Sequence, residues 1–256
     1  MALASDKFFT ATITDRRDIS DDLWVIRVDP GGPFAFTAGQ YATLGLPGSD
    51  RLIERAYSIA SSPHESGLEI FIELVPEGEL TPLLYRLNVG DTLSIRKMPK
   101  GRFLHEFEDV GDHLMLSTVT GIAPFLSLVR RLAKDWDEGR FKGDRRLFLI
   151  QGASRSVELG YREELERFAR DLPWLTYVPT VSRPWDDPGW AGETGRVDDV
   201  IRKYADQWFP DPARGMAHLC GHPSMIEHGK AILGRRGWSK GSIKEESYFV
   251  LKGGAD

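Results

Sequence analysis

The strongest constraint on the fold is a change in the spacing of apolar residues near residue 105 of this 256-residue chain. Before that point, short β-branched or aromatic segments are separated by clusters of Gly, Pro, Asp and Ser, the pattern of strands joined by turns. These segments, with one helix-like insert at residues 80–87, predict a small antiparallel barrel. The predicted strands are residues 8–16, 23–29, 40–46, 55–60, 68–75 and 92–96.

From His113 onward, short apolar runs alternate with helical patterns. Repeated strand–helix units predict a parallel sheet with helices on both faces, which binds ligands beyond the carboxyl ends of its strands. We therefore expect two domains, residues 1–104 and 105–256. The predicted strand and helix pairs are residues 113–118 with 123–134, 146–151 with 157–170, 175–181 with 197–204, and 217–220 with 223–233.

Composition excludes several classes of protein. A net charge of -5 disfavours a general nucleic-acid binder. The single cysteine, Cys220, excludes an internal disulfide framework and a cysteine-ligated iron–sulfur cluster built by this chain alone, which needs about four thiolates. No secretory signal and no run of about 18 apolar residues is present, and the six histidines lack HExxH spacing. We therefore expect a cytoplasmic protein without a membrane span or a metal site.

The most informative short segment is Arg55-Ala56-Tyr57-Ser58. Because side chains alternate along a strand, we expect Arg55 and Tyr57 on one face and Ser58 on the other. A guanidinium can bind a diphosphate and a tyrosine ring can stack on a heteroaromatic ring system, so one ligand could use both. The same residue types also suit a plain edge strand with an exposed arginine, and the segment alone leaves both interpretations open.

The flanking sequence gives this segment its context. The stretch FAFTAGQY at residues 34–41 precedes it, and VPEGELTP at residues 75–82 follows it. In this order and spacing, the segments resemble the ferredoxin–NADP⁺ reductase family, in particular its compact bacterial branch, over residues 8–249. The resemblance implies a two-domain β + α/β fold. An FAD-binding antiparallel barrel would be followed by a parallel-sheet NADP(H)-binding domain whose C-terminal tail returns to the flavin.

The resemblance also implies how FAD is bound. Arg55 would contact the diphosphate, Tyr57 would pack on the isoalloxazine ring, and Ser58 would hydrogen-bond the flavin. The strand at residues 72–75 would contact the cofactor mainly through its backbone. Thr81 would offer the diphosphate a hydroxyl at a helix start, although it suits a simple N-cap equally well. The predicted FAD residues are Arg55, Ala56, Tyr57, Ser58, Ile72, Glu73, Leu74, Val75, Gly78, Leu80, Thr81, Thr118, Tyr248 and Phe249.

Residues 117–124 follow a predicted strand and precede a helix, as a phosphate loop does. The family usually has Gly-Thr-Gly here, but this chain has Val119 at the first glycine. A β-branched residue disfavours positive φ, so we expect the loop backbone there to be tighter or displaced. Thr118 would lie near the reactive edge of the flavin, and Thr120 and Gly121 would contact NADP.

Three arginines follow predicted strands or open a helix beyond them: Arg155, Arg183 and Arg196. The guanidinium fork matches phosphate oxygens, whereas an NAD site more often offers a carboxylate to the ribose hydroxyls. By the resemblance these arginines bind the 2′-phosphate, which favours NADP over NAD, although each also suits a solvated surface. The predicted NADP residues are Thr120, Gly121, Arg155, Ser182, Arg183, Arg196, Cys220, Gly221 and Met225.

The segment CGHPSM at residues 220–225 resembles the family's turn beside the nicotinamide. Near the end of the chain, Tyr248 would cover the flavin and move for hydride transfer, and Phe249 would touch the adenine of FAD. An aromatic residue so placed is also an ordinary hydrophobic anchor. The predicted catalytic residues are Ser58, Cys220, Glu246 and Tyr248.

The resemblance implies hydride transfer between NADP(H) and flavin N5, with one-electron exchange between the flavin and a ferredoxin or flavodoxin. An alternative keeps both cofactors but has another acceptor, as in an NAD(P)H-dependent flavin reductase or the reductase component of an oxygenase. A non-catalytic nucleotide-sensing module on the same fold is a third hypothesis, which the full set of flavin and NADP residues disfavours. Arg51, Lys97, Lys100 and Arg102 are candidate contacts for an acidic carrier. The family's habit predicts a monomer.

Overall fold

The computed structural model describes residues 7–104, 107 and 111–247. The chain divides into two compact units. The first comprises residues 1–102 and 123–131, and the second comprises residues 103–122 and 132–256. The first half of the helix that begins at Ala123 is therefore grouped with the N-terminal unit. The predicted boundary at 104/105 stays a prediction.

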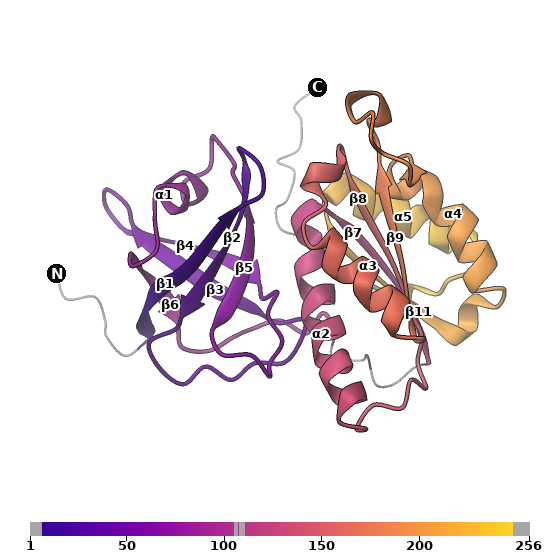
Figure 1. Cartoon of the computed structure of the whole chain (residues 1–256), viewed down its shortest axis with the longest axis horizontal. Coiled ribbons are helices and arrows are strands. Elements are labelled where there is room, and N and C mark those ends of the chain that lie inside the picture. The colour runs from indigo at the N-terminus through magenta and orange to yellow at the C-terminus, as the bar shows by residue number, and fades with distance from the viewer. Residues whose placement is uncertain (1–6, 105–106, 108–110, 248–256) are drawn as a thin grey trace. The chain divides into compact units, whose positions relative to one another are not determined.

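The first unit is an antiparallel sheet with strand order β4-β3-β6-β1-β2-β5. An isolated bridge between Ile59 and Ile70 joins the end of β4 to β5, so the sheet curls into a barrel (Figure 1). The predicted barrel with one helical insert is confirmed, with small shifts in the bounds. The elements are β1 (Phe8–Asp18), β2 (Leu23–Asp29), β3 (Tyr41–Pro47), β4 (Leu52–Ser58), β5 (Leu68–Glu73), α1 (Thr81–Tyr85) and β6 (Thr92–Arg96).

The barrel core follows from the alternation of side chains along its strands. In β2, Trp24, Ile26 and Val28 are fully buried, and Ile70 and Ile72 of β5 join them in one apolar cluster. Burying such side chains contributes roughly 1.5–3 kcal/mol each. The core therefore holds β4, which carries the Arg55–Ser58 segment, in a fixed register with β3.

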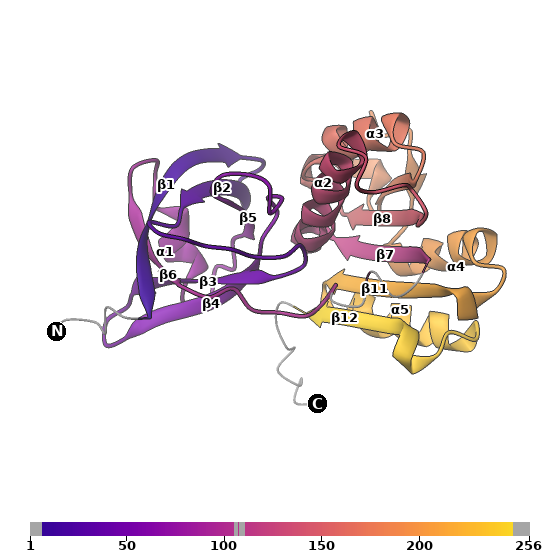
Figure 2. The ribbon, with the colours of Figure 1, turned by 90° about the horizontal axis from the view of Figure 1, so that it is seen from below.

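The second unit is a parallel sheet with strand order β10-β9-β8-β7-β11-β12. Helix α3 lies on one face, and α4 and α5 lie on the other (Figure 2). Its strands are β7 (Asp112–Thr118), β8 (Leu147–Ala153), β9 (Leu175–Val181), β10 (Glu193–Thr194), β11 (Gly215–Gly221) and β12 (Ile243–Ser247). Its helices are α2 (Ala123–Asp137), shared with the first unit, α3 (Arg162–Asp171), α4 (Val197–Trp208) and α5 (Pro223–Arg235).

Two features of this unit differ from the sequence expectation. Helix α3 begins at Arg162 rather than at residue 157, because Tyr161 adopts a left-handed conformation with φ 66° and interrupts the helical pattern. The strands β10 and β12 were not predicted, since one is very short and the other has the polar sequence IKEES. No helix among the described residues is long and apolar enough to cross a membrane.

Candidate functional site

The strand order of the second unit reverses between β7 and β11, which is where open parallel sheets bind ligands. A cavity of about 460 Å³ lies at this edge, lined by residues that follow β7, β8, β9 and β11 and by residues of α4 and α5. This volume is in the range of small-molecule sites, roughly 300–1,000 Å³. The predicted residues that line it are Thr118, Ser182, Arg183, Arg196 and Met225, and Val119 joins them.

Two of the three predicted arginines line this cavity. Arg183 follows β9, and Arg196 is the N-cap residue of α4. Within residues 7–104, 107 and 111–247, neither guanidinium has a carboxylate partner. Arg155, by contrast, is held by Glu158 at 2.9 Å and is not part of the cavity wall. A guanidinium without a carboxylate partner keeps its donors for a ligand, and its fork matches a phosphate group.

The loop after β7 keeps a strained backbone at Val119. Its φ is 44°, in the left-handed region that glycine favours and β-branched residues avoid. The segment Val119–Ile122 then forms a 3₁₀ turn that runs into α2. The Val119 side chain packs against buried Ala153 and Val181, and this contact offsets part of the strain. The loop thus has the backbone conformation expected of glycine while carrying a valine.

Two glycines allow the loops after β7 and β11 to meet. A Cβ atom on Gly121 would lie 2.3 Å from the carbonyl oxygen of Cys220. A Cβ on Gly221, which has φ 129°, would lie 2.2 Å from Oγ1 of Thr118. The same Oγ1 accepts a hydrogen bond from the backbone N–H of His222 at 2.8 Å. Gly121 and Gly221 therefore shape the cavity by close packing and do not line it themselves.

The start of α5 completes the cavity wall. His222 is its N-cap residue, and the ring Nδ1 accepts a hydrogen bond from the backbone N–H of Ser224 at 3.1 Å. The His222 side chain therefore caps α5. Asp198 and His228 also line the cavity, and sequence reasoning missed both. An aspartate in the first turn of a helix and one histidine in another carry no signal beyond ordinary surface residues.

Thr120, Cys220 and Glu246 are further predicted residues of this unit that the structure describes. Thr120 and Cys220 are buried, and Cys220 stands opposite Glu246 in the parallel pairing of β11 with β12. The structure thus brings together two of the predicted catalytic residues. Tyr248 and Phe249 lie outside the described residues, and the roles predicted for all of these stay predictions.

On the barrel, β4 presents the residues predicted to bind FAD. Arg55 and Ala56 are exposed, the ring of Tyr57 packs partly on the core, and Ser58 is buried. Burial raises the pKa of the Tyr57 hydroxyl above its ordinary range. The Arg55 guanidinium donates to Glu79 at 2.6 Å and to the carbonyl of Glu54 at 2.7 Å. Hydrogen bonds from Arg55 and Arg51 hold the pKa of Glu79 below its usual value.

The segment from β5 to α1 offers mainly backbone groups. The side chains of Ile72 and Leu80 are in the core, so only their backbone atoms can meet a ligand. Thr81 Oγ1 accepts from the Val75 N–H at 2.9 Å and donates to the Val75 carbonyl at 3.1 Å. The N-cap of α1 is Leu80, so Thr81 is not a cap, and its hydroxyl instead closes the turn that contains Gly78.

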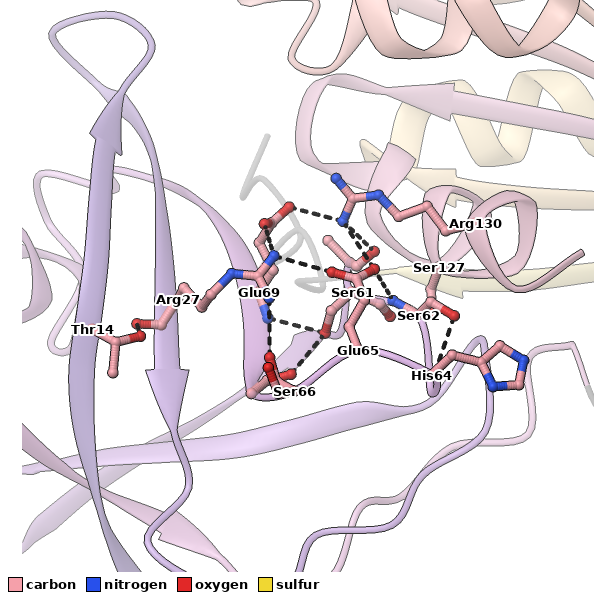
Figure 3. Close-up of polar contacts among 12 residues, drawn as sticks. Thr14, Arg27, Ser61, Ser62, His64, Glu65, Ser66, Glu69, Ser127 and Arg130 are labelled. Carbon is pink, nitrogen blue, oxygen red and sulfur yellow. Dashed lines mark hydrogen bonds and ion pairs between the residues drawn. The ribbon is translucent and has the colours of Figure 1, made fainter. Parts of the chain in front are cut away.

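A buried polar network anchors the chain that continues from β4 (Figure 3). Ser127 of α2 donates to the Ser61 carbonyl at 2.7 Å. Glu69 accepts from Arg130 at 3.0 Å and from Arg27 at 2.7 Å. Both contacts lie within the first unit, and Glu69 is only 9% exposed. Since a buried carboxylate needs such partners, the network fixes residues 60–62 directly beyond the predicted flavin segment.

The chemistry of these residues fits the two cofactors that the sequence suggests. A cationic fork, a half-buried aromatic ring and a buried hydroxyl on one strand suit a flavin dinucleotide, although a diphosphate would have to share Arg55 with Glu79. Two guanidiniums in a cavity at the strand ends, with no carboxylate partner in the part of the chain that the structure describes, suit a phosphorylated nucleotide.

Comparison with known proteins agrees with this assignment. Residues 10–105 match the oxidoreductase FAD-binding domain, and residues 115–230 match the oxidoreductase NAD-binding domain. The ferredoxin–NADP reductase of Pseudomonas aeruginosa is 31% identical over 239 residues, which cover 88% of each chain. The chain belongs to the ferredoxin–NADP reductase family. As a member, it is an oxidoreductase whose cofactors are FAD and NADP(H), and it transfers electrons between NADP(H) and an acceptor.

Another relative at similar identity is named for a hydroxylase system. The phenol hydroxylase P5 protein of Acinetobacter pittii is 30% identical over 250 residues, covering 96% of this chain and 67% of that protein. Among solved structures, the ferredoxin NADP⁺ reductase of Neisseria gonorrhoeae with bound FAD and NADP matches with a TM-score of 0.81 and 25% identity. That match covers 95% of this chain and 99% of that one. Family membership therefore leaves the acceptor open between small carriers and oxygenase components.

Proposed function

We propose that this protein is a ferredoxin or flavodoxin–NADP⁺ reductase in which Arg183 and Arg196 bind the 2′-phosphate of NADPH. The observation that carries the proposal is the pair of guanidiniums lining one cavity at the switch point of the sheet, without a carboxylate partner in the described part of the chain. A phosphate dianion is the ligand that such a pair binds best. The cavity wall also includes Thr118 and Met225, and would hold the dinucleotide between them.

The barrel residues have supporting roles in the proposal. Arg55 binds the FAD diphosphate, Tyr57 covers the flavin ring, and Ser58 hydrogen-bonds to it. Bound FAD would supply the redox chemistry, by accepting a hydride from the nicotinamide and exchanging single electrons with the carrier. Glu79 holds the Arg55 guanidinium in place through a charge-assisted hydrogen bond. The fixed segment beyond β4 keeps Ser58 in position.

The choice of acceptor is supported by the relatives that are matched over most of their length. These are ferredoxin or flavodoxin reductases, including those of Azotobacter vinelandii and Shigella flexneri. A second candidate function is the reductase component of an oxygenase. It is favoured by the comparable identity, 30%, to the reductase component of phenol 2-monooxygenase from Pseudomonas. An NAD(P)H-dependent flavin reductase, a cytoplasmic location and a monomeric state stay predictions.

The first test concerns the dinucleotide. Replacing Arg183 with Ala should raise the KM for NADPH about 10- to 100-fold, because a hydrogen bond to a charged group contributes about 1.5–3 kcal/mol. The KM for NADH, which lacks the 2′-phosphate, should change little. Arg155→Ala is the matched control, since Arg155 is paired with Glu158 and stands outside the cavity wall. Equal effects of Arg183→Ala on both dinucleotides would remove Arg183 from the 2′-phosphate site.

The second test concerns the acceptor. Steady-state kcat/KM should be compared for ferredoxin, flavodoxin and free flavin with NADPH as the donor. We expect a carrier protein to be preferred and its kcat/KM to fall with salt, because Lys97, Lys100 and Arg102 follow β6 and could steer an acidic partner. A preference for free flavin would favour the flavin reductase alternative instead.

A further inference from the structure

The cavity lined by the two arginines also contains a hydrogen-bonded aspartate–histidine pair that the proposed function leaves unexplained. Asp198 is in the first turn of α4, two residues after Arg196, and His228 is on α5. The His228 Nδ1 and the Asp198 Oδ2 are 2.9 Å apart, and both residues line the cavity. The pair therefore joins the two helices in the wall of the cavity that Arg183 and Arg196 also line.

A carboxylate at this place works against the proposed ligand. A phosphate dianion is repelled by a nearby negative charge, and the interaction is stronger in a cavity than in bulk water. A carboxylate that accepts hydrogen bonds from ribose hydroxyls is instead the usual feature of an NAD site. Asp198 left alone would thus favour NADH over NADPH, in opposition to Arg183 and Arg196.

We propose that Asp198 and His228 form a specificity pair that selects the 2′-phosphate over the 2′-hydroxyl. This inference rests on the proposed function, because it assumes that the cavity binds the 2′-phosphate end of NADPH. His228 keeps the Asp198 carboxylate engaged, so the carboxylate does not meet the ligand. The side chain of Asp198 is only 14% exposed, which matches a carboxylate turned to its partner rather than to a ligand.

The hydrogen bond also sets how the imidazole faces the cavity. An ionised carboxylate is only an acceptor, so the His228 Nδ1 carries the proton in this pair. The opposite ring nitrogen, Nε2, takes no part in this hydrogen bond, and the side chain is 59% exposed. The charged and titratable groups that share this cavity wall are Arg183, Arg196, Asp198, His222 and His228. Of the two imidazoles, His222 has its Nδ1 committed to the start of α5.

The test uses three variants: His228→Ala, Asp198→Asn and the double variant. Calorimetry on the FAD-loaded full chain measures the Kd of 2′-phospho-AMP and of AMP, which differ only in the 2′-phosphate. Steady-state assays with NADPH and NADH separate KM from kcat. Arg235→Ala is the matched control, because Arg235 is an exposed cation on the same helix that is not part of the cavity wall. Circular dichroism and flavin content establish that each variant is folded.

We expect His228→Ala to weaken 2′-phospho-AMP binding by about tenfold or more, since it unmasks a like charge beside the phosphate. The loss should be much larger for 2′-phospho-AMP than for AMP, and the KM for NADPH should rise more than the KM for NADH. The double variant should recover most of the lost 2′-phospho-AMP affinity, because the repelling carboxylate is gone. A role in folding alone would not give this rescue.

The possible failures are distinguishable. Arg183→Ala could weaken the binding of 2′-phospho-AMP more than that of AMP while His228→Ala weakens both equally. The role of Asp198 and His228 in specificity would then be wrong, and the proposed function would stand. A loss in His228→Ala that the double variant does not reverse also overturns the pair. If Arg183→Ala affects both nucleotides equally, the cavity is not the 2′-phosphate site and both proposals fall together.

Discussion

Val119 offers the sharpest test of how the phosphate loop is built. At an ordinary position, replacing Ala with Gly lowers stability, because glycine loses more chain entropy on folding, about 0.4–1 kcal/mol. Val119 has φ 44°, where any residue with a Cβ atom is strained by roughly 1–2 kcal/mol. Glycine at residue 119 has no Cβ atom and is therefore not strained, whereas alanine is strained there. The Val119→Gly protein should therefore be more stable than Val119→Ala by roughly 1 kcal/mol, the reverse of the usual order.

The comparison of Ala with Gly is used because it removes the packing contribution. Both variants lose the contact of the valine side chain with Ala153 and Val181, so the loss cancels between them. In a comparison of either variant with the wild type, this loss of packing does not cancel. A half-buried valine contributes up to about 1.5 kcal/mol, which is similar in size to the strain. Only the difference between the two variants isolates the backbone conformation.

Thermal unfolding monitored by circular dichroism is the assay. For a unit of this size, 1 kcal/mol corresponds to a shift of about 2–4 °C in Tm. The control is the same pair of substitutions at Val157, which is exposed and is not among the residues with positive φ. There Val157→Ala should be the more stable variant. If the Ala variant is the more stable at both positions, the backbone of residue 119 is not strained and does not adopt the left-handed conformation.

Two further predictions concern buried charge. Burial and the neighbouring His113 hold the pKa of His218 well below its ordinary value. The unfolded chain therefore binds a proton that the folded chain does not, and the free energy of unfolding falls as the pH drops below about 6.5. The free energy of unfolding should change by at most about 1.4 kcal/mol per pH unit from this group. His218→Gln should reduce this pH dependence in urea unfolding measured between about pH 7 and 5. An unchanged pH dependence would contradict the prediction. Glu69→Ala removes a buried carboxylate that binds both Arg27 and Arg130, and it should cost about 3 kcal/mol in urea unfolding. Glu65→Ala, at a carboxylate that is 30% exposed, should cost about 1 kcal/mol or less, and equal losses would show that burial of Glu69 is not decisive.

Most of the architecture was predictable because it depends on local patterns. Strand and helix periodicity placed the barrel before the α/β unit, and the three arginines were expected beyond the carboxyl ends of strands, as found. Where prediction failed, a single backbone angle or a weak pattern was responsible. The start of α3 depends on the left-handed Tyr161, and β12 has a polar sequence that only pairing with β11 makes a strand.

The sequence by itself determined the fold and the kinds of residue available for FAD and NADP(H), because these follow from periodicity and from motifs along the chain. The tertiary structure decided which residues share a site. It separated Arg183 and Arg196, which line the cavity, from Arg155, which is bound to Glu158. It also brought together Asp198 of α4 and His228 of α5, which are thirty residues apart in the chain. A contact of this kind depends on how two helices pack on a sheet, and no spacing in the sequence carries that information.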